Sequence, residues 1–271
     1  MAGSLDEAEE LTKRGKGLSD EWDFFFASVD DAVVSIFVDL GIRPEVPIEA
    51  RPWLLWVHVD MLSPRPDGLS SAEESPKLKQ IGDALDAAIS ATCGAQLVGR
   101  VTGGGKREFY FHAAEPGPLD EAAAQTMQSF EGYAFTCGSA FQPEWDHYLG
   151  TLYPSDTNLQ RMQNRRLLDG LAAEGDVHEL PRKVDHWLYF ADAEGRAGCR
   201  DTLTEIGFVV EEEGVAEEES QLPFSLVVSR VDSIDRQSIN GVTLELVRLA
   251  GEYRGDYDGW GCEATTEARE S

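Results

Sequence analysis

The chain is poor in basic residues and has no long apolar run. Its 271 residues include 23 Lys and Arg against 50 Asp and Glu, which gives a formal net charge of −27. A surface this negative repels phosphate backbones, so we expect no direct binding of nucleic acid. No stretch approaches the roughly 20 apolar residues that cross a bilayer, so we expect no membrane span.

Cysteine is also scarce. The four cysteines are Cys93, Cys137, Cys199 and Cys262, and no two of them form a Cys-x-x-Cys pair. This spacing suggests neither a zinc site nor a disulfide framework. The first ten residues are polar and acidic, which argues against a secretory signal. Together these features predict a cytoplasmic protein with reduced thiols.

Apolar residues are plentiful enough to build cores. The chain is 42% hydrophobic and 9% aromatic, which argues against wholesale disorder. The negative charge then has two interpretations. It can attract a protein partner with a basic segment, or it can serve solubility or adaptation to salt. Composition does not decide between them.

The first half of the chain alternates strands with helices. Trp53 to Val59 is almost continuously apolar, as a buried strand is. Ser75 is placed to cap a helix with Pro76 at its first position, and Asp120 is placed to cap a second helix. A tight turn is predicted at Asp30-Asp31. The predicted strands are 22–29, 32–40, 53–59, 95–101, 107–112 and 133–137, and the helices end near residues 94 and 130.

The second half repeats this pattern. The predicted helices are 158–173, 193–206 and 238–253, and the predicted strands are 184–190, one beginning at 208, 224–230 and 257–262. We therefore predict an α+β protein of two tandem ferredoxin-like (βαββαβ) domains, with helices on one face of mainly antiparallel sheets. The predicted parts are a polar arm (1–20), an α+β domain (21–154), a ferredoxin-like domain (155–263) and a mobile tail (264–271).

Two short segments of the second half carry Trp beside carboxylates. In the first segment, Asp185 and Trp187 share one face of the strand and His186 takes the other, so Asp185 and His186 cannot form a catalytic pair easily. The common sheet order 4-1-3-2 makes the first and last strands neighbours and brings Trp187 and Trp260 into one region. We expect one Trp in the core and the other at the surface, where it would anchor a partner.

The last strand and an acidic segment complete the candidate interaction surface. Asp256 and Asp258 flank Tyr257 and lie on one face of the last strand. Six glutamates occur between Glu211 and Glu219, and we expect them to form a solvated, mobile hairpin loop. A sharper hypothesis is that they mimic phosphate in a basic groove. The candidate interaction residues are Asp185, His186, Trp187, Asp256, Tyr257, Asp258, Trp260, Glu211, Glu212 and Glu213.

No motif of catalysis or cofactor binding is present. Gly103-Gly104-Gly105 lies between two predicted strands without a helix behind it, which favours a hairpin turn over a phosphate loop. The five histidines are not spaced as a metal pair on a helix. We therefore expect no enzyme activity, no cofactor and no metal.

Several motifs of the second half occur together in one order. They are Asn164-Arg165-Arg166-Leu167-Leu168, Gly175-Asp176, Pro181-Arg182, Val184-Asp185-His186-Trp187, Gly207-Phe208 and Tyr257-Asp258-Gly259-Trp260. With this order and spacing, the region from about Asn158 onward resembles the regulator of ribonuclease activity B family. The first half resembles an uncharacterised domain often fused ahead of that regulator, on stretches such as Arg51-Pro52-Trp53 and Arg107-Glu108-Phe109-Tyr110-Phe111.

The resemblance implies a function by binding. Members of that family are small acidic proteins of ferredoxin-like fold, and one binds ribonuclease E and inhibits RNA cleavage. We therefore expect an acidic regulator that inhibits an endoribonuclease of this type by binding a basic segment of it. One alternative is an enzyme or ligand-binding protein with a pocket in the first domain, lined by Trp53, Trp56, Phe109 and Phe111. Another is a scaffold that tethers two partners.

Overall fold

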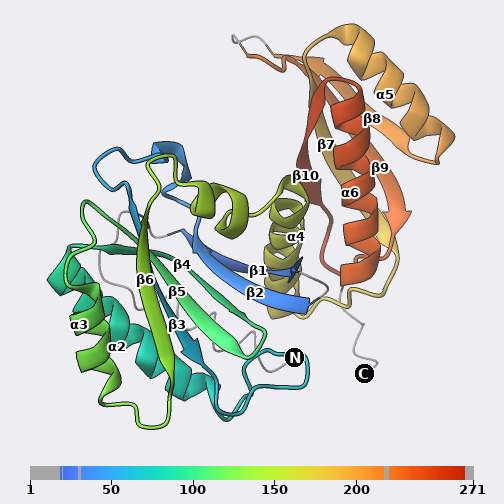
Figure 1. Cartoon of the computed structure of the whole chain (residues 1–271). Helices are drawn as coiled ribbons and strands as arrows, with labels where there is room; N and C mark the ends of the chain where they lie inside the picture. Colours follow the sequence, from blue (N-terminus) through green and yellow to red (C-terminus); the bar gives the residue numbers. More distant parts are fainter. Residues whose placement is uncertain (1–18, 20, 30–31, 217–219, 266–271) are drawn as a thin grey trace, which may run out of the picture. The chain divides into compact units, whose positions relative to one another are not determined.

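The chain divides into two compact units, residues 1–155 and 156–271 (Figure 1). The computed structural model describes residues 19, 21–29, 32–216 and 220–265. The predicted turn at Asp30-Asp31, almost all of the predicted polar arm, Glu217 to Glu219 and the last six residues lie outside the described residues. Among the described residues, no helix combines the length and apolar character that crossing a bilayer requires.

The first unit is built on one six-stranded antiparallel sheet in the order β1-β2-β4-β5-β3-β6. Its strands are β1 (Trp22–Val29), β2 (Ala32–Asp39), β3 (Trp53–Asp60), β4 (Gln96–Gly103), β5 (Lys106–Ala113) and β6 (Phe135–Phe141). Its helices are the 3₁₀-helix η1 (Arg43–Glu45), α2 (Ser75–Cys93), α3 (Leu119–Met127) and a short π-helix, η2 (Tyr148–Leu152).

Helix α2 buries the apolar face that its sequence predicts. Leu78, Ile81, Leu85 and Ile89 recur at helical spacing and are all fully buried in the core beneath the sheet. The helix starts earlier than predicted, because the backbone N–H of Leu78 already donates to the carbonyl of Glu74. Glu74, not Ser75, is therefore the N-cap residue.

Helix α3 differs from the prediction in the same way. The N–H of Ala122 donates to the carbonyl of Pro118, so the helix begins at Leu119, and Asp120 lies in its first turn. A carboxylate in the first turn still stabilises the helix through its dipole. In both helices the backbone is already helical one or two residues before the side chain that is best suited to cap it.

The aromatic residues that follow β6, Trp145 and Tyr148, pack on the sheet face opposite α2 and α3. Trp145 stacks on His112 with ring centroids 3.6 Å apart, and the hydroxyl of Tyr148 donates to the carbonyl of Asp39 at 2.7 Å. Phe109 and Phe111 lie in the core on the other face. These two Phe side chains are therefore core residues, which does not support the alternative hypothesis that they line a pocket.

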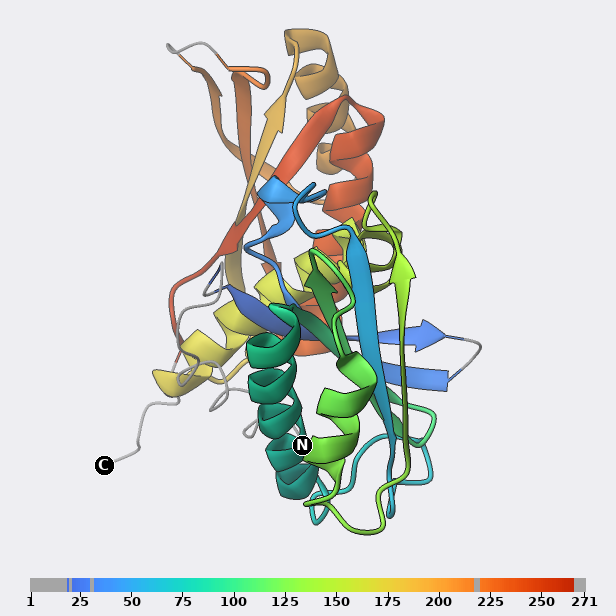
Figure 2. The same cartoon turned by 60° about the vertical axis from the view of Figure 1, so that its left-hand side comes forward.

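The second unit is a four-stranded antiparallel sheet in the order β10-β7-β9-β8, with helices α5 and α6 packed against it (Figures 1 and 2). Its strands are β7 (Arg182–Phe190), β8 (Val209–Val215), β9 (Phe224–Asp232) and β10 (Gly255–Gly261). Its helices are α4 (Asp156–Ala173), α5 (Ala193–Glu205) and α6 (Arg236–Glu252). Asp192 and Asp235 cap α5 and α6 with their side chains.

The first acidic triplet is part of a strand, which corrects the predicted loop. Glu211, Glu212 and Glu213 lie within β8, which pairs with β9 through a bulge after Val210. Glu211 contacts Lys183 and Glu213 contacts Arg196, at 3.0 and 3.1 Å. The strand forms because β9 supplies ladder hydrogen bonds and cations from neighbouring elements offset the repulsion between carboxylates.

A buried ion pair fixes the entry to β7. The guanidinium of Arg182 bonds the carboxylate of Asp176 and the carbonyl of Val177, and both charged side chains are buried. The N–H of Thr265 donates to the same carboxylate at 2.6 Å. Burial by itself would raise the pKa of Asp176, but the bonds from Thr265 and Arg182 outweigh it and hold the pKa below its usual range. Thr265, in the predicted mobile tail, is therefore hydrogen-bonded.

We predict that Asp176→Asn destabilises the second unit by about 3 kcal/mol at neutral pH, because it leaves the Arg182 charge buried without a counter-charge. Urea unfolding measures this loss. The difference from the unaltered chain should shrink as pH falls through the lowered pKa of Asp176, since protonation removes the same charge. Asp169→Asn on the exposed side of α4 is the control, with an expected change within about 0.5 kcal/mol. Equal effects of the two substitutions would contradict the prediction.

Candidate functional site

Strands β7 and β10 lie side by side and bring the two predicted Trp segments together. They pair antiparallel, with Gly259 opposite Trp187 and Trp260 opposite His186. The register shifts between Tyr257 and Gly259, so the edge strand β10 carries a bulge at this point. The predicted neighbourhood of the first and last strands is therefore present.

Residues along β7 alternate between core and surface as the sequence predicts. Val184, His186 and Leu188 are fully buried, whereas Asp185 and Trp187 are partly exposed. Asp185 contacts Lys183 at 3.2 Å, and Lys183 also contacts Glu211 on β8. Asp185 thus belongs to a surface charge network across the sheet and not to a pair with His186.

The two tryptophans divide their roles as expected, one in the core and one at the surface. Trp260 is 4% exposed, and its indole N–H donates to Oδ1 of Asn164 on α4 at 2.9 Å. Trp187 is half-buried, and its ring lies against Gly261 of β10. Trp260 therefore joins the strand to α4, while Trp187 keeps part of its indole available at the surface.

Asn164 organises this corner of the unit, and it is not among the candidate residues that the sequence predicts. Its amide nitrogen donates to Asn240 and Thr243 on α6, both at 2.8 Å. Its oxygen accepts from Trp260 and from Gln160, the latter at 3.0 Å. Asn and Gln four residues apart on a helix were the available signal, because that spacing puts both amides on one face.

A hollow of about 320 Å³ opens between α4 and the edge of the sheet. It is lined by Gln160, Gln163, Asn164, Leu167, Trp187, Asp258, Gly259 and Trp260. Three predicted site residues, Trp187, Asp258 and Trp260, therefore share one cavity. Aromatic surface, side-chain amides and one carboxylate can bind a polar or cationic group there by stacking and hydrogen bonding.

His186 and Tyr257 form a separate pair inside the core. Nδ1 of His186 lies 2.9 Å from the hydroxyl of Tyr257, and the imidazole packs edge-on against Phe208. Burial, together with the positive charge of Arg230, lowers the pKa of His186 to about 3. Burial and the charge of Asp258 raise the pKa of Tyr257. Both groups are uncharged at neutral pH, and their hydrogen bond joins β7 to β10 within the core.

The remaining predicted residues are carboxylates on the outer surface. Asp256 and Asp258 are exposed on either side of the buried Tyr257. Glu212 is exposed and has no ion-pair partner within the described part of the chain, whereas Glu211 and Glu213 are paired with cations. No group of three His, Cys, Asp or Glu in the described ranges could hold a metal ion.

The two α+β units match two protein families. Residues 161–262 match the family described as Regulator of ribonuclease activity B, and residues 20–153 match a family of unknown function (DUF695). The family predicted for the second half is thus confirmed, and so is the order of the two parts. The second unit is therefore similar to a family that is described as regulatory. No curated protein matches the chain.

Two solved structures are similar to the chain at a low level. One is "Crystal structure of putative glycine cleavage system transcriptional repressor", 10% identical, covering 78% of this chain and 98% of that one, with a TM-score of 0.24. The other is an unknown protein from Galdieria sulphuraria, 13% identical, covering 79% and 99%, with a TM-score of 0.22. Both TM-scores are too low to bear on the fold or the function.

We predict that the buried His186 makes stability fall in mild acid. The unfolded chain binds a proton near the ordinary pKa of 6.5, whereas the folded chain resists protonation until pH about 3. The contribution is complete above pH 6.5 and is lost progressively as pH falls below that value. Replacing His186 by Gln should flatten the slope of unfolding free energy between pH 6.5 and 4 by about one proton. Urea titrations at a series of pH values measure this slope.

The control for this prediction is Tyr257→Phe. It removes the hydroxyl that bonds His186 but leaves the imidazole buried. Its slope should stay close to that of the unaltered chain even though its stability at neutral pH falls. An unchanged slope in the His186→Gln variant would show that His186 does not carry this pH dependence.

Proposed function

We propose that this chain is a non-catalytic regulatory protein that binds an endoribonuclease of the ribonuclease E type and lowers its activity, thereby modulating RNA turnover. The match of residues 161–262 to a ribonuclease-regulator family supports this proposal. The observation that carries it is the hollow beside Trp187, where aromatic surface and a carboxylate meet at the edge of the sheet. We place this activity in the cytoplasm, without a cofactor and without direct contact to nucleic acid.

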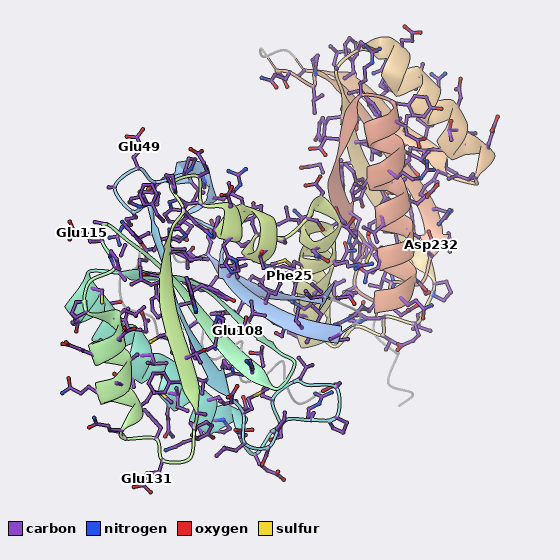
Figure 3. The ribbon with its side chains drawn as sticks, in the orientation of Figure 1. Phe25, Glu49, Glu108, Glu115, Glu131 and Asp232 are labelled. Carbon is purple, nitrogen blue, oxygen red and sulfur yellow. The ribbon has the colours of Figure 1, made fainter. Side chains whose placement is uncertain are left out.

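The acidic exterior supports a partner with a basic segment. The net charge of −27 attracts such a segment over roughly 8–10 Å at ordinary salt and speeds association. In the second unit, Glu212, Asp256 and Asp258 are exposed carboxylates. In the first unit, Glu49, Glu115 and Glu131 project outward from its surface (Figure 3).

Trp187 supports a specific contact rather than diffuse attraction. Interface energy concentrates in a few large side chains that become fully desolvated, and Trp is prominent among them. Trp187 is half-buried before any partner binds, so little side-chain freedom is lost on binding. Asp185 and Asp258 then provide polar surroundings for it.

The chemistry of the candidate residues supports a role without catalysis. His186, the residue best suited to move protons, is fully buried and stays neutral because its pKa is lowered to about 3. Asp185 lies on the other face of the strand, where it pairs with Lys183. A general base needs access to its substrate, and this imidazole has none.

We further propose that both units are ferredoxin-like domains. The strand and helix order β3-α2-β4-β5-α3-β6 in the first unit and β7-α5-β8-β9-α6-β10 in the second supports this assignment. In each unit the first of the four strands lies between the third and the fourth. This arrangement is the 4-1-3-2 order expected for a βαββαβ unit.

The proposed function predicts salt-sensitive inhibition. Cleavage of a model RNA by the purified nuclease should slow with increasing amounts of this chain at about 50 mM salt, and the half-inhibiting concentration should rise about tenfold at about 300 mM salt. Trp187→Ala should weaken inhibition about tenfold or more. Ile206→Ala, which also trims an exposed apolar side chain, is the control and should inhibit normally.

The same assay can refute the proposal. Unchanged cleavage at low salt, together with the absence of a complex in gel filtration, would exclude regulation by binding to that nuclease.

A further inference from the structure

We infer that the hollow beside Trp187 takes an arginine side chain of the protein partner. This inference rests on the proposed function, because it names the chemistry that the proposed surface recognises. It draws on three features of the hollow: a flat aromatic wall, an exposed carboxylate and the side-chain amides of α4.

The aromatic wall is formed by Trp187 and two glycines of β10. A Cβ atom added at Gly261 would lie 3.2 Å from the Trp187 ring, so the indole rests against the strand. Gly259 is opposite Trp187, and a Cβ atom added there would meet nothing within 4 Å. Gly259 has φ of +148°, a conformation that L side chains rarely adopt. The strand thus leaves open space beside the ring for a planar group.

The carboxylate is that of Asp258. It is exposed at the rim of the hollow and has no ion-pair partner within the described residues. Lys183, Arg196 and Arg200 are paired with other acids of the unit. A cation from outside the chain therefore meets an uncompensated charge at Asp258.

The amides of α4 complete the recognition. Asn164 uses its amide nitrogen and oxygen on Asn240, Thr243, Trp260 and Gln160. Gln160 donates its NH₂ group to Asn164, and its Oε1 accepts no hydrogen bond from the described residues. Gln160 and Gln163 both line the hollow from α4, so their side-chain amides are available to a ligand on the side opposite the strand.

These groups favour arginine over lysine and over neutral side chains. A guanidinium is planar, stacks on an indole face, and carries five N–H donors that can reach a carboxylate and amide oxygens together. A lysine ammonium is a strongly hydrated point charge that does not stack. A neutral ligand would leave Asp258 without a counter-charge, and the net charge of −27 repels an acidic one.

The test is an NMR titration of the full chain, whose tryptophans are labelled with ¹⁵N. The ligands are three short Gly/Ser peptides that differ only in their central residue. That residue is arginine, its neutral isostere citrulline, or lysine. Trp187→Phe identifies the Trp187 indole N–H signal by its loss. The arginine peptide should shift this signal and bind at least about tenfold more tightly than the citrulline and lysine peptides, which corresponds to about 1.4 kcal/mol or more.

Asp258→Asn should weaken binding of the arginine peptide about tenfold, and Asp169→Asn, which removes one charge from α4 outside the hollow, should not. An unchanged Trp260 indole signal in the Asp258→Asn variant shows that the hollow is still formed. Equal binding of the arginine and citrulline peptides, or no shift of the Trp187 signal at millimolar peptide, would overturn the inference.

The titration and the RNA cleavage assay fail independently. Inhibition of the nuclease without any response to the arginine peptide would refute the arginine site and leave the regulator proposal standing. Binding of the arginine peptide without inhibition would refute the regulator proposal and leave the arginine site standing.

Discussion

The surface of the second unit depends on the four hydrogen bonds of Asn164. This side chain is fully buried, so an unsatisfied amide there would cost about 1–3 kcal/mol. Its two donors and its oxygen all have partners, on α6, on β10 and within α4. Because hydrogen bonds are directional, these four bonds together constrain the placement of α4. A polar contact therefore determines where the helix lies and where the hollow opens.

That constraint links packing to recognition. If α4 were held by apolar contacts alone, it could slide by part of a turn at modest cost, because apolar contacts are not directional. The bond from the indole of Trp260 to Asn164 prevents this by fixing the edge strand against the helix. Trp187 and Asp258 then keep constant positions relative to Gln160. A pre-formed site of this kind binds without a large ordering cost.

The negative charge of the second unit is partly neutralised by ion pairs, which the sequence does not show. Glu211 and Glu213 belong to ion-pair networks with Lys183, Arg196 and Arg200, so the strand that carries them is partly neutralised. Exposed ion pairs of this kind contribute little stability. Within the described residues, the effective acidic surface is therefore made by carboxylates without ion-pair partners, and Asp258, which lines the hollow beside Trp187, is one of them.

Much of the fold was predictable from local patterns. The alternation along β7 and the helical spacing in α2 gave correct strands, helices and buried faces, because these patterns reflect one element against one core. The adjacency of Trp187 and Trp260 followed from the assumed strand order. The density of glutamates predicts a solvated loop at Glu211 to Glu213 because so many carboxylates cannot pack in a core, whereas pairing with β9 holds them in an edge strand where they remain exposed.

Other features of the site could not be predicted. The role of Asn164 requires knowing that residues 164, 240, 243 and 260 meet in space, and no local pattern contains that information. The ion pair of Asp176 and Arg182 and the contact of Asp176 with Thr265 are of the same kind. Long-range polar contacts are specified by the assembled fold, and the sequence shows them only as unexplained Asn, Asp and Arg residues.

The central claim is that the protein acts through the surface at the edge of its second sheet. Hydrogen–deuterium exchange of the full chain, with and without the nuclease, tests this claim most directly. The expected result is slower exchange in β10 and in the first half of α4 when the nuclease is present, with β8 little changed. Slower exchange confined to residues 21–155, or unchanged exchange in a complex that demonstrably forms, would contradict it.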